Sequence, residues 1–298
     1  SVKYLNGYLL ESKNVIISNT RSPLFNLPKM TYGSMANDGG FLILDSIERD
    51  KLLKENTNAE KFLKPFIGGT EFIKNIKRWC IWIEDKDLDQ ANSIKFIKER
   101  IEKVKDHRLK KKDYKWSEKS HKFVENRHQE NDSIFIPSPT SERRKYLPIG
   151  FCEKGTLITA PNLIIYDPEM YLFAILSSRM HMLWIKAIGG KLETRIRYSV
   201  ELCYNTFPLP NINIETKKLL KEISLKVLVD ERERHFEKPI SVLYDPDTMP
   251  KGLKDLHQEI DIIVEKCYQS KTFLNDEEKL KCLFGMYADK SPESERLI

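Results

Sequence analysis

The chain has 298 residues, which is long enough for about two domains of ordinary size. Hydrophobic residues make up 40% of it, charged residues 32%, and the net charge is +6, so it can bury a core and still present a strongly charged surface. It has no apolar run long enough to span a membrane and no secretion signal at its beginning, so we expect a cytoplasmic protein without a membrane partner.

The first predicted elements are helices and one buried strand. Capping-box spacings at Asp45–Glu48 and Thr57–Glu60 predict that a helix begins at each. The aromatic and β-branched segment WCIWI (79–83) predicts a buried strand. A narrow apolar stripe repeats every three or four residues over 93–112, which predicts a surface helix with Ser93 as its cap.

The middle of the chain reads as strands around one long helix. Strand patterns occur in SIFIPS, KYLPIGF, TLIT and LIIY, all between residues 133 and 166. Next, 168–188 is apolar over most of its helical circumference, with Asp167 as a possible cap and Gly189-Gly190 as its end, so we expect a central helix. Strand character returns over KLETRIRYSVELCYNTF (191–207).

The last third is predicted to be helical. FPLPNIN (207–213) contains two prolines that stop regular structure, and three apolar stripes at helical spacing follow it. The predicted fold class is therefore α+β: a mixed-sheet domain followed by a small α-helical bundle, with a boundary near residue 210.

Charge is concentrated in one segment. Residues 95–122 contain twelve basic and five acidic side chains, whereas 213–298 contain 15 basic and 18 acidic ones, so a polyanion would face the first two-thirds of the chain. Tyr114 and Trp116 interleave the basic run 108–119, which suits a flexible arm on a nucleic-acid backbone; a disordered lysine-rich loop is the alternative. The candidate contacts are Lys110, Lys111, Lys112 and Lys115.

Two further groups of charges suggest a recognition surface. In GKLETRIRY, strand alternation would place Glu193, Arg195 and Arg197 on one face. Arginine can donate to guanine in the major groove and glutamate can accept from the amine of cytosine, although a solvated strand face is the alternative. A second group just before a strand suits phosphate contacts, with a solvated turn as its alternative: Arg143, Arg144 and Lys145.

Recognisable catalytic motifs are missing from the sequence. The five cysteines form no CxxC pair, the six histidines are scattered, and His121 and His128 read as solvated residues of a polar loop, so we expect no metal site. GxSxG, GxGxxG and GxxxxGK[ST] are absent. The chain also lacks the Pro-Pro loop of amino-group methyltransferases and a glycine-rich turn for S-adenosylmethionine, so we expect no catalytic residue and no cofactor in it.

Several long segments, in order, resemble the target recognition domain of MmeI-like type IIG restriction–modification enzymes. They are YGSMANDGGFLIL, KPFIGGTEFI, RWCIWI, SERRKYLPIGF, SSRMHMLWIKAIGGKLETRIRYS and YNTFPLP. LYDPDTMP and FLNDEEKLKCLFGMY resemble the C-terminal helical domain of the same enzymes. The matching segments extend from about residue 25 to 290, nearly the whole chain.

This resemblance implies a domain order and a parent protein. One polypeptide of that family carries an endonuclease, a helical spacer, an adenine methyltransferase, the recognition domain and the helical end. Residues 1–20 would then leave the methyltransferase domain, 21–210 would form the recognition domain and 211–298 the helical domain. S-adenosylmethionine and magnesium would belong to the full-length parent, a site-specific adenine methyltransferase with endonuclease.

The resemblance also implies partners and site residues. The partners would be double-stranded DNA and the upstream methyltransferase domain. The family's base-choosing acid-x-basic pair falls on Glu193 and Arg195, and Arg197 lies in the RYS sequence that follows. We therefore expect a module that reads bases in the major groove for a methyltransferase elsewhere in the protein. The alternatives are a protein-interaction scaffold and a stand-alone enzyme of unrecognised type.

Overall fold

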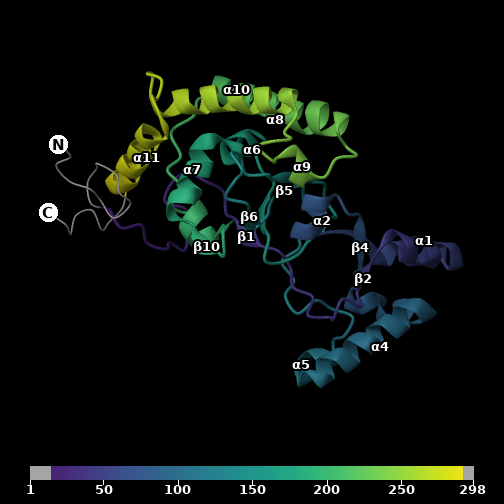
Figure 1. Ribbon diagram of the computed structural model, residues 1–298. Helices are drawn as coiled ribbons and strands as arrows, with labels where there is room; N and C mark the ends of the chain where they lie inside the picture. Colours follow the sequence, from purple (N-terminus) through teal and green to yellow (C-terminus); the bar gives the residue numbers. More distant parts are fainter. Residues whose placement is uncertain (1–14, 291–298) are drawn as a thin grey trace. The chain divides into compact units, whose positions relative to one another are not determined.

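The computed structural model describes residues 15–290 (Figure 1), so most of the expected exit segment over 1–20 lies outside the described residues. The chain forms two compact units. Of the described residues, the first contains 15–30, Ile136–Phe151 and 167–290, and the second contains Thr31–Phe135 and Cys152–Tyr166. The segment around residues 190–197 and the C-terminal helices thus belong to the same unit. The boundary near residue 210, between a recognition domain and a helical domain, stays a prediction.

The second unit is built on a four-stranded sheet of order β2-β4-β3-β8. Its strands are β2 (Ile43–Leu44), β4 (Arg78–Ile81), β3 (Leu63–Ile67) and β8 (Leu157–Ile158). Antiparallel pairing joins β4 to β2 and β3, whereas β8 pairs with β3 in parallel. The buried strand predicted from WCIWI is confirmed as β4, whose Cys80 and Ile81 lie in the core.

A further sheet has the order β1-β9-β5-β7. Its strands are β1 (Thr31–Tyr32), β9 (Leu163–Tyr166), β5 (Ser133–Ile136) and β7 (Gly150–Cys152), and the chain passes between the units within β5 and β7. Every residue of β5 is buried, which matches the apolar run over 134–136, because a strand covered on both faces needs no polar side.

Helices complete the second unit. They are α1 (Ser46–Glu55), η1 (Thr57–Phe62), α2 (Gly69–Lys74), η2 (Asp85–Asp87), α3 (Leu88–Asn92), α4 (Lys95–Lys110) and α5 (Tyr114–Ser117). The capping box at Asp45 is confirmed. The one at Thr57 is wrong, because the side chain of Asn56 caps η1. Ser93 ends α3 instead of capping α4, which begins after Ile94.

The first unit contains a small sheet of order β10-β11-β6. Its strands are β10 (Gly190–Leu192), β11 (Arg195–Arg197) and β6 (Pro139–Thr140), all antiparallel. The strand predicted over 191–207 is therefore too long, since a π-helical turn, η3 (Val200–Tyr204), follows β11.

The central helix predicted over 168–188 is broken into α6 (Tyr171–Ser177) and α7 (Arg179–Ile188). Ser178 is extended, and its side chain accepts from the backbone N–H of His181, so it ends one helix and caps the next. Asp167 is not the cap, because it has a φ of 47° and α6 starts after Met170.

All regular structure described after residue 213 is helical, as the apolar stripes predict. It comprises α8 (Ile214–Leu225), the π-helical η4 (Lys226–Arg232), α9 (Ile240–Leu243), α10 (Lys251–Tyr268) and α11 (Asp276–Lys290). The α+β fold class is confirmed. Among the described residues, none of the helices is long and apolar enough to cross a membrane. All five cysteines are free thiols.

Candidate nucleic-acid interface

The hairpin β10–β11 carries the predicted base-reading residues, in a different geometry from the one expected. Leu192 pairs with Arg195, so Glu193 and Thr194 form a two-residue turn and Glu193 adopts a φ of 56°. The prediction that Glu193 lies on a strand face with the two arginines is therefore wrong. Arg195 and Arg197 do share the exposed face of β11, while Ile196 between them is buried.

Glu193 and Arg195 are paired with each other. Arg195 Nη2 donates to Glu193 Oε2 at 2.9 Å, and the side chains of Arg195 and Glu193 remain 51% and 76% exposed. An exposed ion pair of this kind contributes about 1 kcal/mol or less, so a ligand can replace it at small cost. Among the described residues, the Arg197 guanidinium has no acidic partner.

The hairpin leaves the end of α7 through a tight backbone approach at Gly189. A Cβ at this position would lie 2.4 Å from the carbonyl oxygen of Ile185. Beyond β11, the backbone N–H of Tyr198 donates to the Ser138 carbonyl at 2.8 Å, and the Ser138 hydroxyl donates to the Tyr198 carbonyl at 3.3 Å. The base of the hairpin is thus fixed on both sides, while the residues of its turn, Glu193 and Thr194, are exposed.

A buried histidine, His181, binds Tyr198, the residue that directly follows β11. His181 Nδ1 donates to the Leu176 carbonyl at 2.7 Å, and the Tyr198 hydroxyl donates to His181 Nε2 at 3.1 Å. Burial lowers the pKa of His181 to about 4, so the imidazole is neutral at physiological pH and holds this one tautomer. Burial also raises the pKa of Tyr198 and keeps its hydroxyl a donor.

The basic loop that contains Arg143, Arg144 and Lys145 lies beside the hairpin. β6 pairs with β11 through Ile196 and Thr140, and Arg144 Nη1 donates to the Thr140 hydroxyl at 3.3 Å. The structure therefore brings two of the predicted residue groups close together, because the basic loop directly follows β6, a strand of the hairpin's sheet. Lys145 is exposed, whereas Arg144 is half-buried, and this burial lowers the pKa of Arg144.

Arg143 has two acidic partners that the sequence did not reveal. Its guanidinium forms ion pairs with Asp247 and, at 4.0 Å, with Asp245. These carboxylates belong to the segment before α10, a hundred residues further along the chain, so spacing gives no signal for the contact. A phosphate that bound Arg143 would have to replace both of them.

The lysine group lies in the second unit, at the end of α4. The expected flexible arm is wrong: residues 110–112 close α4 and α5 follows at Tyr114. The N–H of Asp113 donates to the Arg108 carbonyl and that of Lys112 to Leu109, both at 2.9 Å, and Lys112 has a φ of 59°. This is the Schellman arrangement, with lysine where glycine is favoured. The four predicted lysines are all exposed: Lys110, Lys111, Lys112 and Lys115.

Arg108 explains why this basic corner is ordered. Its side chain is fully buried and donates five hydrogen bonds of 2.7 to 3.1 Å to backbone carbonyls. The acceptors are Ala36, Asn37, Trp116, Lys119 and Lys122. Burial lowers the pKa of the guanidinium. One basic residue of the run is therefore structural, and it holds the corner that presents the others.

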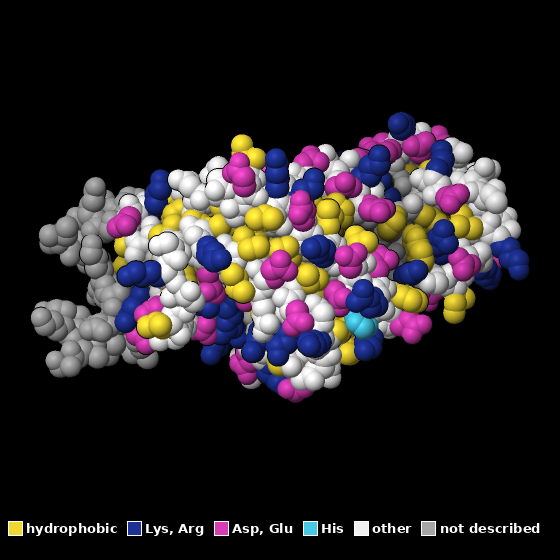
Figure 2. All heavy atoms as spheres, turned by 90° about the horizontal axis from the view of Figure 1, so that it is seen from above, with side chains coloured by type: hydrophobic (Ala, Val, Ile, Leu, Met, Phe, Trp, Pro, Cys, Tyr) yellow, Lys and Arg dark blue, Asp and Glu magenta, His cyan; other side chains and the backbone are white. Residues whose placement is uncertain are grey.

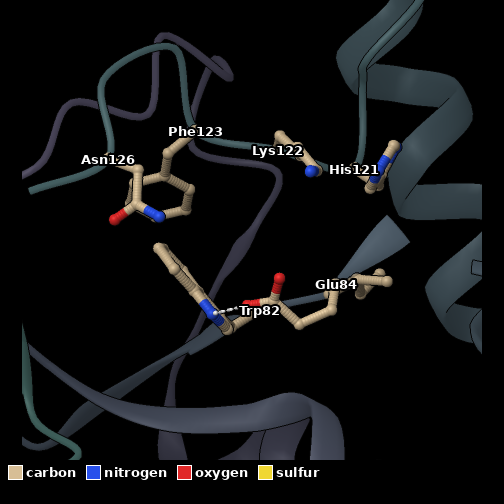
Figure 3. A pocket seen from close by; sticks show the side chains of 7 residues that line it. Trp82, Glu84, His121, Lys122, Phe123 and Asn126 are labelled. Atoms are coloured by element: carbon tan, nitrogen blue, oxygen red, sulfur yellow. Dashed lines mark hydrogen bonds between the residues drawn. The ribbon is translucent and has the colours of Figure 1, made fainter. Parts of the chain in front are cut away.

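A small pocket in the second unit lies between Trp82, Phe123 and Asn126, with Glu84 at its wall (Figure 3). Its volume of about 40 Å³ leaves room for a few water molecules. Nearby, His121 Nε2 lies 2.8 Å from Asp85, whose pKa is lowered by hydrogen bonds from Lys122 and His121.

The prediction of solvated histidines is also wrong. His121 is buried, and the ring of His128 packs edge-on against Trp82 at 5.6 Å. No group of acidic, histidine and cysteine side chains in the described part of the chain could hold a metal ion. On the face over α8 and α10, basic and acidic side chains are interspersed (Figure 2), in keeping with the acidic excess of the last third.

The fold and this geometry define an α+β recognition module, in which an exposed charged hairpin lies beside a basic loop that follows a strand of the same sheet. The family model described as "MmeI, target recognition domain" matches residues 11–211, and the one described as "MmeI, C-terminal domain" matches 214–294. The chain therefore belongs to the MmeI family, and the predicted resemblance is confirmed.

Similar proteins agree with this assignment. DNA methyltransferase A of Bacillus subtilis (strain 168) is 38% identical over 291 residues, which cover 97% of this chain and 33% of the relative. The solved structure of the Type IIL restriction-modification enzyme MmeI in complex with DNA matches with a TM-score of 0.88 and 32% identity, over 97% of this chain and 39% of that one. This chain thus spans about a third of the length of the first relative and about two-fifths of that of the second.

Proposed function

We propose that this chain recognises a specific sequence in double-stranded DNA through the major groove, on behalf of an adenine methyltransferase located upstream in the full-length protein. The observation that carries the proposal is the exposed hairpin with Arg195 and Arg197 beside a basic loop, in a chain closely similar to an MmeI structure that contains DNA. S-adenosylmethionine and magnesium would act in that full-length protein.

Base reading is assigned to the hairpin. Arginine carries only donors and glutamate only acceptors, so Arg195 can bind guanine and Glu193 the amine of cytosine in one G·C pair. Arg197 lies two residues along the same exposed face and can reach an adjacent base. The turn position of Glu193 supports this role, because a projecting turn enters a groove more readily than the middle of a strand.

Backbone contacts are assigned to the surface cations on each unit. They are Lys110, Lys111, Lys112 and Lys115 in the second unit, and Arg143, Arg144 and Lys145 in the first. Such contacts position a protein on DNA and add affinity that does not depend on sequence.

The decisive experiment exchanges the two charges of the hairpin in the full-length protein, Glu193→Lys with Arg195→Asp, and maps the methylated sites by sequencing. We expect a changed base at one position of the recognition site, since each good base contact discriminates by about 1–3 kcal/mol. The matched control exchanges another exposed ion pair, Lys51→Glu with Glu55→Lys in α1, and should leave the site unchanged. An unaltered site with normal activity in the hairpin variant would remove Glu193 and Arg195 from the interface.

A further inference from the structure

The chain segment from β6 to β7 begins in the sheet of the hairpin and then contacts the C-terminal helices α10 and η4. Its first residues, Pro139–Thr140, pair with β11, and its last residues, 146–149, are buried. The three basic residues of the loop lie between these two fixed ends. Their position relative to the hairpin therefore depends on what holds the buried end.

The buried end is held by α10. The ring of Tyr146 stacks on His257, with centroids 4.4 Å apart and planes 20° from parallel. The Tyr146 hydroxyl donates to Asp261 Oδ2 at 2.9 Å. His257 is itself fixed by Tyr244, whose hydroxyl lies 2.9 Å from His257 Nε2. His257 and Asp261, which lie one turn apart on α10, thus both contact Tyr146.

η4 holds the far end of the same segment. Arg232 Nη1 donates to the Ile149 carbonyl at 2.7 Å, and Arg232 Nε donates to the Tyr244 hydroxyl at 3.2 Å. The contacts at Tyr146 and Ile149 are therefore parts of one buried network. All of its supporting side chains come from residues that the family assigns to the C-terminal domain.

Asp261 connects this loop to the helix that leads into the hairpin. While Oδ2 accepts from Tyr146, Oδ1 accepts from the backbone N–H of Arg179 at 2.7 Å. Arg179 is the first residue of α7, and a single residue, Gly189, separates the end of α7 from β10. The carboxylate of Asp261 therefore holds both the first residue of α7 and Tyr146, the residue that follows the basic loop.

We propose that Asp261 is a positioning residue of the DNA interface, which sets the basic loop Arg143–Lys145 relative to the base-reading hairpin through Tyr146 and the N-terminus of α7. The C-terminal domain then serves recognition without touching a base. This inference rests on the proposed function, because it assumes that the loop and the hairpin contact the same duplex.

The electrostatics of Asp261 support a role beyond stability. Burial raises the pKa of Asp261 to about 6. At neutral pH the carboxylate is therefore ionised, and its desolvation costs folding free energy. Neutral side chains of similar size avoid that cost. What the carboxylate provides is two acceptors at a fixed separation, one for each of the two elements that it connects.

A double-mutant cycle in the full-length protein tests the proposal, with binding to a mixed-sequence DNA duplex measured by fluorescence anisotropy. We expect Asp261→Ala to weaken binding by about tenfold, on the order of the coupling found within a shared network. The loss should nearly vanish when Arg143, Arg144 and Lys145 are already alanine, because the carboxylate acts through them. Asp261→Asn should restore most of the affinity, since its carbonyl still accepts from Arg179 and its amide can donate to the Tyr146 oxygen.

Two companion variants separate positioning from stability. Tyr146→Phe keeps the ring on His257 and removes only the hydroxyl bond, so it serves if Asp261→Ala does not fold. Tyr268→Phe is the matched control, because it removes another hydroxyl bond of α10, to the Pro208 carbonyl at 2.8 Å, away from the loop. It should lower the unfolding free energy and leave DNA affinity unchanged.

The outcomes are distinct. Additive losses from Asp261→Ala and the triple alanine variant, or equal losses from Tyr146→Phe and Tyr268→Phe, would show a stability effect alone and overturn the inference. In either case the proposed function would stand. Absence of any salt-dependent DNA binding by the unmodified protein would instead overturn the proposed function, and the inference with it.

Discussion

Lys112 allows a structural role and a DNA-binding role to be measured on one residue. It occupies the position after the α4 cap with a φ of 59°, where glycine is the favoured residue and any other side chain costs about 1 kcal/mol or more. Lys112→Gly and Lys112→Ala both remove the charge, and only the glycine relieves the backbone. The difference between the two variants therefore isolates the backbone cost from the charge.

We expect Lys112→Gly to be about 1 kcal/mol more stable than Lys112→Ala in urea unfolding, after glycine's greater freedom in the unfolded chain has offset part of the gain. Both variants should bind DNA more weakly to the same degree, and the slope of log K against log salt should fall by about 0.9 in each. Equal stabilities would refute the assigned strain. Unchanged binding would show that Lys112 only complements the negative end of the α4 dipole.

The remaining predictions concern the lysines as a group, the cofactor and acid stability. Alanine at Lys110, Lys111, Lys112 and Lys115 together should flatten the salt slope by about one unit for each lysine that binds a phosphate, and an unchanged slope would mark the group as solvated surface. Calorimetry on this chain should detect no S-adenosylmethionine binding, and stoichiometric binding would contradict the assignment of the cofactor to the upstream domain. The pKa of His181 is lowered from 6.5 to about 4, so the stability due to its neutral form is present above pH 6.5 and is lost as the pH falls through 4. The advantage of the wild type over His181→Gln in unfolding free energy should therefore shrink by about 3 kcal/mol over this range, and a constant difference in urea unfolding would refute the buried neutral ring.

The helical last third was predictable because its physical signal is local. Apolar residues at helical spacing must share a face, and α8, α10 and α11 bury those faces. The hairpin was not predictable in the same way. Its turn, Glu193-Thr194, lacks the glycine or asparagine that usually announces a two-residue turn, so the alternation reads as one continuous strand. The break at Ser178 did carry a signal, since serine is a favoured N-cap.

The contacts that organise the candidate interface depend on residues far apart in sequence. Arg108 belongs to a lysine-rich run, and only the meeting of α4 with residues 36–37 and 116–122 reveals that it is buried. Asp247 meets Arg143, and Asp261 meets Tyr146, across a hundred residues or more. Period and composition describe single elements, so they cannot identify these pairs.

Solvent exposure decides which cations can exchange their present partners for DNA. The five carbonyl bonds of buried Arg108 have no replacement in water, so breaking them would cost the desolvation of several groups at about 1–3 kcal/mol each. The pair Glu193–Arg195 is exposed and contributes about 1 kcal/mol or less, whereas one good base contact contributes about 1–3 kcal/mol of discrimination. We therefore expect DNA to replace the internal partner at the hairpin and not at Arg108. Arg143 lies between these cases, because its side chain is 60% exposed but has two carboxylate partners. A phosphate must first displace Asp245 and Asp247 from Arg143. We therefore expect Arg143 to contribute less to DNA affinity than Arg197, which has no acidic partner in the described part of the chain.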